Sequence, residues 1–456
     1  MNLVYGVKDK PKFGQMLIFA FQQVLAILAA TIAVPALINS NEAVVAKFPE
    51  FAAGGGMSAA AALLGAGVGT IVYQLFTKFR SPVFLGSSFA FIGSLVAAFA
   101  GAVSATAGFA GILLGAVFAG LVYVVIALVV KFAGVKWISK LMPPVVIGPT
   151  VALIGLSLAG AAIKDVFSYG PQDINGSFIM SGSAWASLAC ALVTLLVVII
   201  VSTYGKKMLK LIPFIFGILA GYVVALIFTL CGVPVIDLSV FKELQILAVP
   251  DFTFLTALKG FKEINGAYIA TVAVAYVPVA FVVFAEHIAD HKNLSTIIDQ
   301  DLLENPGLHR TLLGDGVGSI AGAFFGGCPN TTYGESVGCV AITRNASVIT
   351  ITTAAIMCIL FSFFGPFVAF LDSIPGCVMG GVCVTLYGFI ACSGLKMIQK
   401  VDLNQNKNLF VVASILIPGI GGMAMAIGQV TLTKIACALI LGIIVNLVVS
   451  KAKEEA

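Results

Sequence analysis

Long apolar runs follow one another along nearly the whole chain, and short segments rich in charged and turn-forming residues separate them. A helix needs about 20 mostly apolar residues to cross the hydrocarbon core of a bilayer. The chain divides into fourteen such runs, and each predicts one membrane-spanning segment. The predicted spans are residues 14–38, 57–77, 84–103, 107–130, 143–163, 181–203, 211–231, 268–292, 311–326, 331–344, 347–370, 374–395, 408–425 and 431–450.

The composition supports this interpretation. Only 10% of the 456 residues are charged, and 60% are hydrophobic. Soluble domains carry about 25% charged residues, so the composition excludes a soluble enzyme, a disordered chain and a nucleic-acid binder. The 48 glycines are typical of close helix packing and broken membrane helices. The nine cysteines form no Cys-x-x-Cys pair, which favours buried thiols over disulfides or metal ligands.

The basic residues predict an orientation. With a cytoplasmic N-terminus, nineteen of the 25 Lys and Arg residues fall in segments on the cytoplasmic side of the fourteen predicted spans. Such an excess is typical of cytoplasmic loops, and one missed or invented span would move every later loop to the other side. We therefore expect a multi-pass protein of the cell membrane with both termini in the cytoplasm.

Two predicted spans, the third and the tenth, contain proline, glycine and hydroxyl residues in an apolar context, at 82–91 and 326–335. Irregular backbone at membrane depth needs protein or a water-filled cavity to satisfy its polar groups. The two segments are seven spans apart, an odd number, so the second half would cross the membrane in the opposite sense. This layout predicts an inverted repeat with a substrate site where the broken segments meet. The alternative is two re-entrant loops without a site.

Four acidic residues fall inside predicted spans: Glu286, Asp290, Asp315 and Glu335. A charge at bilayer depth costs at least about 2.5–3.5 kcal/mol, so such residues are usually functional. Glu286 and Asp290 share one helix face, and two nearby carboxylates in a low dielectric resist joint ionisation. This pair predicts a proton-coupled site, unless Asp290 is simply solvated near Lys292.

Glu335 follows Gly334 in the second broken segment, where a backbone N–H and a carboxylate can face one ligand; the alternative is a salt bridge to Arg344. Asp315 suits either a hydrogen bond between helices or a proton relay. His287 and His291 flank the acids and either tune them or face the headgroups.

Too few ligands surround these histidines for a metal site, and we expect neither metal nor cofactor. Gln22 and Gln23 are amides in an apolar run, and they suit an interhelical hydrogen bond or the substrate site.

A uracil-like ring offers two N–H donors and two carbonyl acceptors. Carboxylates could accept from the donors, and backbone amides near Phe89 and Gly334 could donate to the acceptors. A purine dione would fit equally, so the residues alone predict a site for a planar polar heterocycle.

Over nearly its full length the chain resembles the nucleobase–ascorbate transporter family. The matching motifs are Gln22-Gln23 with residues 30–35, Leu85-Gly86-Ser87-Ser88-Phe89-Ala90-Phe91, Ala285-Glu286-His287-Ile288, residues 301–303 and 306–310, Pro329-Asn330-Thr331-Thr332-Tyr333-Gly334-Glu335 with Ser336-Val337-Gly338 and Thr343-Arg344, and Pro375 with Val378-Met379-Gly380-Gly381.

The resemblance implies an all-α polytopic fold of two inverted seven-span repeats, with short antiparallel strands in spans 3 and 10 that cross at the site. It implies a core domain from residues 1–135 and 266–372, and a gate domain from residues 136–265 and 373–456. It also implies a transporter rather than an enzyme, which imports uracil with protons across the cell membrane and forms a homodimer.

The resemblance also assigns residues. Glu286 and Glu335 would accept from the ligand's N–H groups, the amides of Phe89 and Gly334 would donate to its carbonyls, and Tyr333 and Tyr387 would pack near the ring. The candidates for proton coupling are Glu286, Asp290 and Asp315, and the supporting residues are Gln22, Gln23 and Ser336.

The chain departs from the family pattern at three places. Ser336 replaces the usual Asn, Gln22-Gln23 replaces Gln-His, and Asp290 stands where some uracil transporters have histidine. Xanthine and urate members usually carry Gln at the position of Glu335, which favours uracil over a xanthine or purine substrate. An anion exchanger or channel would need basic site residues. A membrane transferase would need clustered Asp residues for Mg²⁺, and the sequence has neither.

Overall fold

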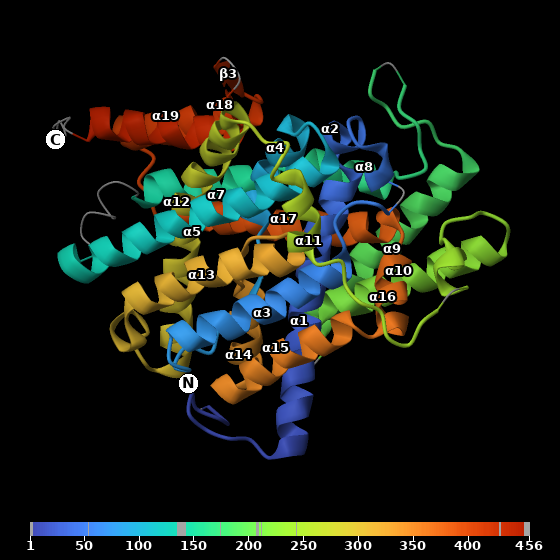
Figure 1. The fold of residues 1–456 in the computed structure, drawn as a ribbon, viewed down its shortest axis with the longest axis horizontal. Helices are drawn as coiled ribbons and strands as arrows, with labels where there is room; N and C mark the ends of the chain where they lie inside the picture. Colours follow the sequence, from blue (N-terminus) through green and yellow to red (C-terminus); the bar gives the residue numbers. More distant parts are fainter. Residues whose placement is uncertain are drawn as a thin grey trace.

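The computed structural model describes residues 3–450 except 53, 135–142, 174, 207–208, 211, 243 and 428–429. Helices dominate the described chain (Figure 1). In the first half they are α1 (Phe13–Ser40), α2 (Glu42–Val45), α3 (Ala59–Phe76), α4 (Ile92–Gly101), α5 (Ala105–Ala133), α7 (Pro144–Ser157), α8 (Ala159–Val166), α9 (Gly182–Tyr204), α10 (Pro213–Leu230) and α11 (Thr253–Gly260). In the second half they are α12 (Gly266–Ile298), α13 (Leu308–Gly326), α14 (Gly334–Thr343), α15 (Val348–Ser362), α16 (Gly365–Asp372), α17 (Gly376–Ile398), α18 (Asn406–Ile420) and α19 (Lys434–Val449).

Eight described helical segments are long and apolar enough to cross a membrane, and four shorter apolar helices accompany them. The protein is therefore a multi-pass membrane protein, as predicted. The count of fourteen spans and the inverted repeat stay predictions. So do the terminal orientation and the cell membrane, and the basic residues Lys136, Lys140, Lys207, Lys451 and Lys453 lie outside the described part of the chain.

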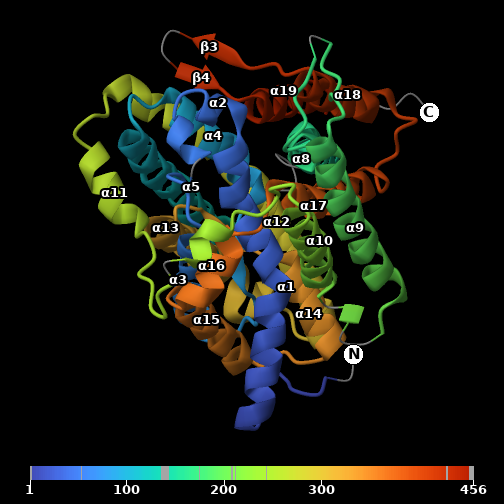
Figure 2. The same ribbon diagram turned by 90° about the vertical axis from the view of Figure 1, so that its right-hand side faces the viewer.

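Some boundaries differ from the prediction. The predicted span 347–370 is divided between α15 and α16, and α16 begins at Gly365 with Pro366 in its first turn. Proline has no backbone N–H and blocks the preceding helical turn, so a new helix starts there. Helix α11 lies in a predicted loop. The start of the last predicted span instead forms a strand, β4 (Val430–Leu432), which pairs with β3 (Met425–Ile427) at the periphery (Figure 2).

The two predicted broken segments do contain short strands. β1 (Leu85–Ser87) and β2 (Asn330–Thr332) pair antiparallel, with Gly86 opposite Thr331. Glycine is required at position 86, because a Cβ there would lie 2.4 Å from the ring of Tyr333. Both strands are buried, and each leads directly into a helical turn. The fold thus brings residues 245 positions apart in sequence to one point in its interior.

The helices pack closely around this point. α3 lies against α13 and α15, and α5 lies against α12 and α13. At the α3–α13 contact a Cβ on Gly65 would come within 2.4 Å of the Gly322 carbonyl oxygen. In the other part of the bundle α17 packs on α7, α8 and α9, and α18 packs on α19. The division into core and gate domains at residues 135, 265 and 372 stays a prediction.

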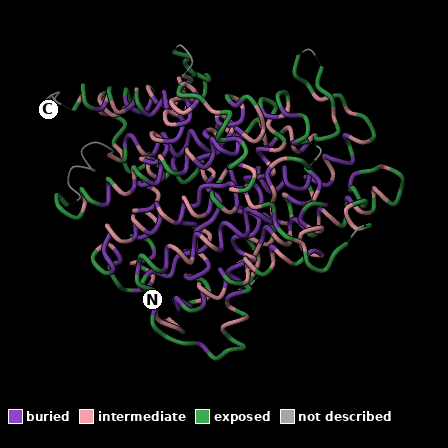
Figure 3. The backbone as a smooth tube through the Cα atoms, viewed as in Figure 1, coloured by how far each residue is buried: buried purple, intermediate pink, exposed green. Residues whose placement is uncertain are grey.

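Burial is concentrated at the centre of the bundle, and exposed positions lie along its periphery (Figure 3). Many peripheral side chains are large and apolar, such as Leu121, Ile200 and Leu360, which suits a surface in contact with lipid. The nine cysteines are all free; seven are buried, whereas Cys231 and Cys392 are exposed. The prediction of buried thiols is therefore wrong for these two, which project from the ends or outer faces of apolar helices.

Candidate functional site

A cavity of about 420 Å³ opens beside the crossing strands. Its first wall comes from the strands, the turns that follow them and α12. Its second wall comes from α7, α10 and α17. The lining residues of the first wall are Ser88, Phe89, Ala90, Glu286, Ala289, Asp290, Thr331, Thr332, Tyr333, Gly334 and Glu335. Those of the second are Val151, Ile154, Phe214, Leu386, Phe389, Ile390, Ser393 and Met397.

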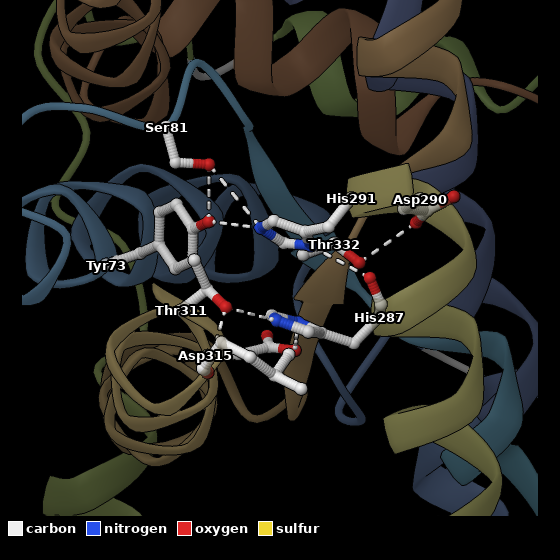
Figure 4. A network of polar contacts seen from close by, with 9 residues as sticks. Tyr73, Ser81, His287, Asp290, His291, Thr311, Asp315 and Thr332 are labelled. Carbon is white, nitrogen blue, oxygen red and sulfur yellow. Dashed lines mark hydrogen bonds and ion pairs between the residues drawn. The ribbon is translucent and has the colours of Figure 1, made fainter. Parts of the chain in front are cut away.

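Three carboxylates reach the cavity from two elements. Glu286 and Asp290 lie one helical turn apart on α12, and Glu335 lies in the first turn of α14. The Thr332 hydroxyl donates to Asp290 Oδ2 over 2.9 Å (Figure 4). Among the described residues none of these carboxylates joins an ion pair. The predicted alternative of a salt bridge between Glu335 and Arg344 is therefore wrong, and the site holds acidic charge without a cationic partner.

Backbone donors face the same cavity. Helix α14 begins at Gly334, and the short helical turn Phe89–Phe91 begins at Phe89; neither start is capped by a side chain. The first N–H groups of a helix have no partner within the helix, and they carry partial positive charge. One residue separates the two starts from β2 and β1, and both Gly334 and Phe89 line the cavity.

Aromatic rings border these donors. The rings of Phe89 and Tyr387 lie 5.9 Å apart in an edge-to-face arrangement. The Tyr333 hydroxyl donates to the Ser87 carbonyl over 2.6 Å, which fixes its ring against β1. Tyr387 does not itself line the cavity but reaches it through Phe89, and its buried hydroxyl has no hydrogen-bond partner among the described residues.

The predicted supporting residues divide into two groups. Gln23 donates from Nε2 to Ser336 Oγ, and the Phe84 N–H donates to the same oxygen over 3.1 Å. Ser336 thus ties α1 and the start of β1 to the helix that carries Glu335. Gln22 is also buried, but its Oε1 atom has no hydrogen-bond partner in the described part of the chain.

Asp315 lies away from the cavity. It is fully buried on α13, and its Oδ2 atom is 2.8 Å from His287 Nδ1. The other ring nitrogen of His287 is 2.9 Å from Thr311 Oγ1. His291 also is fully buried, with Nε2 2.7 Å from the Tyr73 hydroxyl. The alternative that these histidines face the headgroups is therefore wrong (Figure 4).

Sequence reasoning missed four residues of this arrangement: Tyr73, Ser81, Thr311 and Thr332. Tyr73, Ser81 and Thr311 are single hydroxyl residues in or next to apolar runs and belong to no motif, whereas Thr332 lies inside the motif at 329–335 but was assigned no role. One signal did exist, because two buried histidines one turn apart need polar partners from neighbouring helices.

Within the described residues no group of three His, Cys, Asp or Glu side chains is placed to hold a metal ion.

Comparison with known proteins identifies the family. The sequence model of a family described as "Permease family", labelled as xanthine/uracil permeases, matches residues 14–428. The chain belongs to the xanthine/uracil permease family. This result confirms the predicted resemblance to the nucleobase–ascorbate transporters, and it places the chain among permeases rather than among known enzymes.

The chain is also similar to curated relatives in this permease family. It is 39% identical over 455 residues to the uracil permease of Bacillus subtilis, covering 99% of this chain and 96% of the relative. It is 33% identical to the uracil permease of Escherichia coli K12, covering 97% of this chain and 93% of the relative. These relatives match nearly end to end, so the likeness includes both broken segments and all the cavity elements.

Two solved structures that match this permease come from distant proteins. The transmembrane domain of a cyanobacterial bicarbonate transporter matches 97% of this chain with a TM-score of 0.60 at 15% identity, and all of that domain is covered. The murine solute carrier 26 family member A9, an anion transporter, matches 97% of this chain and 69% of its own with a TM-score of 0.66 at 14% identity. At such identities the likeness shows a shared fold alone.

Proposed function

We propose that this permease imports uracil together with protons across the cell membrane. The observation that carries the proposal is the cavity at the strand crossing, which combines three acidic side chains with no ion-pair partner among the described residues and two helix starts without a side-chain cap. The near end-to-end likeness to proteins named uracil permeases supports the choice of substrate.

The polar groups match such a ring one by one. The carboxylates of Glu286 and Glu335 accept from its two N–H groups, and the backbone N–H groups of Phe89 and Gly334 donate to its carbonyls. A ligand removed from water must have these groups paired. Phe89 and Tyr333 provide apolar surface for the ring, and Tyr387 supports Phe89 from behind.

Proton coupling follows from the acids. Glu286, Asp290 and Glu335 share one partly buried site without a neutralising cation, and carboxylates in such a place resist joint ionisation. Protons that bind with the substrate would neutralise the loaded site, which favours its passage through a low-dielectric interior. Glu286 and Asp290 are the proton-binding residues that we propose. Asp315 would act only indirectly, because it is bound to His287 away from the cavity.

A xanthine or other purine substrate is the second candidate. The cavity volume of about 420 Å³ is compatible with it, because this space accommodates a bicyclic ring as well as a single ring. Anion exchange is the weaker alternative: the fold is shared with anion transporters, but the acidic cavity would repel an anion.

For the assembly we propose a homodimer, and cross-linking in membranes with mass measurement would test it.

The test is uptake of labelled uracil into liposomes that contain the purified protein. We expect accumulation only with an inwardly directed proton gradient, and a tenfold excess of unlabelled xanthine should compete weakly. Equal competition by xanthine would contradict the substrate assignment. Uptake that ignores the proton gradient would contradict proton coupling while leaving the substrate assignment standing.

A further inference from the structure

His291 takes no part in the cavity, although it follows Asp290 directly in the sequence. Its side chain is fully buried on a neighbouring face of α12 and points toward Tyr73 of α3 (Figure 4). We propose that His291 is a positioning residue, which fixes α12 against the first strand so that Asp290 stays in place at the cavity. This inference rests on the proposed function of the cavity.

The hydrogen bonds of His291 determine which nitrogen carries its proton. The Nδ1 atom lies 2.8 Å from the His287 carbonyl oxygen, which can only accept, so Nδ1 is the donor. In a neutral ring Nε2 is then an acceptor. The Tyr73 hydroxyl, 2.7 Å away, supplies the donor. The Tyr73 oxygen also lies 2.7 Å from Ser81 Oγ, which is itself 3.4 Å from His291 Nε2, so the two hydroxyl groups and the imidazole ring form one buried polar cluster.

These hydrogen bonds extend to the segment just before β1. Gln74 donates from Nε2 to the Ser81 carbonyl over 2.9 Å and to the Val83 carbonyl over 3.2 Å. The backbone between Ser81 and Leu85 is therefore held by the same turn of α3 that holds His291. Tyr73, Gln74 and Ser81 are all fully buried, so water does not compete for these bonds.

Asp290 reaches the partner strand from the other side. Thr332, its hydrogen-bond donor, ends β2 and stands opposite Leu85 in the strand pair. Two consecutive residues of α12 thus attach the helix near the strand crossing: Asp290 binds Thr332 at the end of β2, and His291 binds Tyr73 of α3, which also contacts Ser81 ahead of β1. Consecutive residues point about 100° apart on a helix, so the two attachments together fix its rotation. Loss of the His291 attachment would let α12 turn and draw Asp290 away from Thr332.

The chain offers matched variants for a test. His291→Phe removes both bonds, Tyr73→Phe removes the donor, and His291→Gln keeps one donor and one acceptor. The control is Tyr276→Phe on the same helix, because the Tyr276 ring is equally buried, stacks on Phe91 and has a hydroxyl without a partner among the described residues. Each variant is purified, and its equilibrium uracil binding and melting temperature are measured.

We expect His291→Phe and Tyr73→Phe each to weaken uracil binding about five- to tenfold, the range of one buried hydrogen bond. His291→Gln should recover most of the loss, and Tyr276→Phe should bind like the unmodified protein. In an Asp290→Asn background, His291→Phe should cause less than about a twofold further loss, because the two residues act through one position. Full additivity, or a lower melting temperature with unchanged binding, would overturn the proposal.

A second measurement needs no ligand. A hydrophobic carbodiimide modifies protonated carboxyl groups, and mass spectrometry compares its rate at Asp290 with that at Glu286 in the same molecule. We expect His291→Phe to change this ratio more than about threefold and Tyr276→Phe to leave it unchanged. An unchanged ratio in His291→Phe would overturn the positioning role. Failure of the unmodified protein to bind uracil would instead contradict the proposed function, and the ratio would still decide the role of His291.

Discussion

Helix α12 has two polar faces that differ in how their groups are satisfied. On one face Glu286 and Asp290 border a cavity, and the one protein partner that the structure shows for Asp290 is the Thr332 hydroxyl. On the other face His287 and His291 lie fully buried, and every ring nitrogen has a protein partner within 2.9 Å. Polar residues on one membrane helix can therefore have different roles: some line a cavity, and others bind neighbouring helices.

The difference follows from what each face lacks. Both histidine rings are satisfied without a ligand, because Asp315, Thr311, Tyr73 and the His287 carbonyl bind their four nitrogens. On the carboxylate face, oxygen acceptors remain unpaired and have no ion-pair partner among the described residues. A ligand with N–H donors, or bound protons, would therefore stabilise this face most. Substitutions on the carboxylate face should thus alter binding, and those on the histidine face should first alter stability or the alignment of α12.

The largest effect should come from the carboxylate face. We expect Glu286→Gln and Glu335→Gln each to weaken uracil binding at least about 30-fold, because the amide cannot take up a proton and replaces a carboxyl acceptor with an NH2 group that repels a ring N–H. Their melting temperatures should stay within a few degrees of the unmodified protein. Titration calorimetry on the purified variants measures the first quantity, and thermal unfolding in detergent measures the second. Wild-type affinity in both variants would show that the cavity is not the binding site.

The next effect should come from the histidine face. Asp315→Ala leaves His287 Nδ1 buried without a partner, which costs about 1–3 kcal/mol of unfolding free energy. Tyr123→Phe is the matched control, because the Tyr123 ring packs edge-on to His287 and its hydroxyl has no partner in the described part of the chain. We expect a lower melting temperature for Asp315→Ala alone, with uracil affinity changed less than in Glu286→Gln. A loss of proton-driven uptake without loss of stability would place Asp315 in the proton pathway.

The strand crossing lies beside α12, and Gly86→Ala tests whether its close packing matters for stability and binding. The new methyl group would collide with the Tyr333 ring, whose hydroxyl is tied to Ser87. Overpacking of this kind costs about 1–3 kcal/mol, and we expect lower stability together with weaker uracil binding. The control is Gly338→Ala on α14, where an added Cβ has open space. Equal behaviour of the two alanine variants would show that the contact at Gly86 is unimportant.

The smallest effect should come from Ser336→Ala, behind Glu335. The substitution removes the shared acceptor of Gln23 and of the Phe84 N–H. We expect about a three- to tenfold loss of uracil affinity, since one hydrogen-bond network of about 1 kcal/mol aligns α14. Ser336→Asn should bind better than Ser336→Ala if a polar side chain is what the position needs. Unchanged binding in Ser336→Ala would limit the role of Gln23 to packing.

The sequence was sufficient for the carboxylate face and insufficient for the histidine face. Acids inside apolar runs stand out against the cost of burying a charge, and Pro-Gly-Ser segments mark broken spans, so Glu286, Glu335 and the two broken segments could be predicted. The two short strands were expected only from the resemblance to the family. The partners of His287 and His291 could not, because Tyr73 and Thr311 come from other helices and their spacing carries no pattern. Helix packing brings them together. Asp315 was recognised as unusual, but its place away from the cavity depends on the rotation of α13.

In the proposed site, cavity carboxylates accept hydrogen bonds from both ring N–H groups of uracil. The most direct test is equilibrium binding of uracil, 1-methyluracil and 3-methyluracil to the purified protein. Each methyl group removes one N–H donor and leaves one buried carboxylate unpaired, which a site built for that donor tolerates poorly. We predict that both methylated rings bind at least about 100-fold more weakly than uracil. Binding of either one with the affinity of uracil would contradict the account.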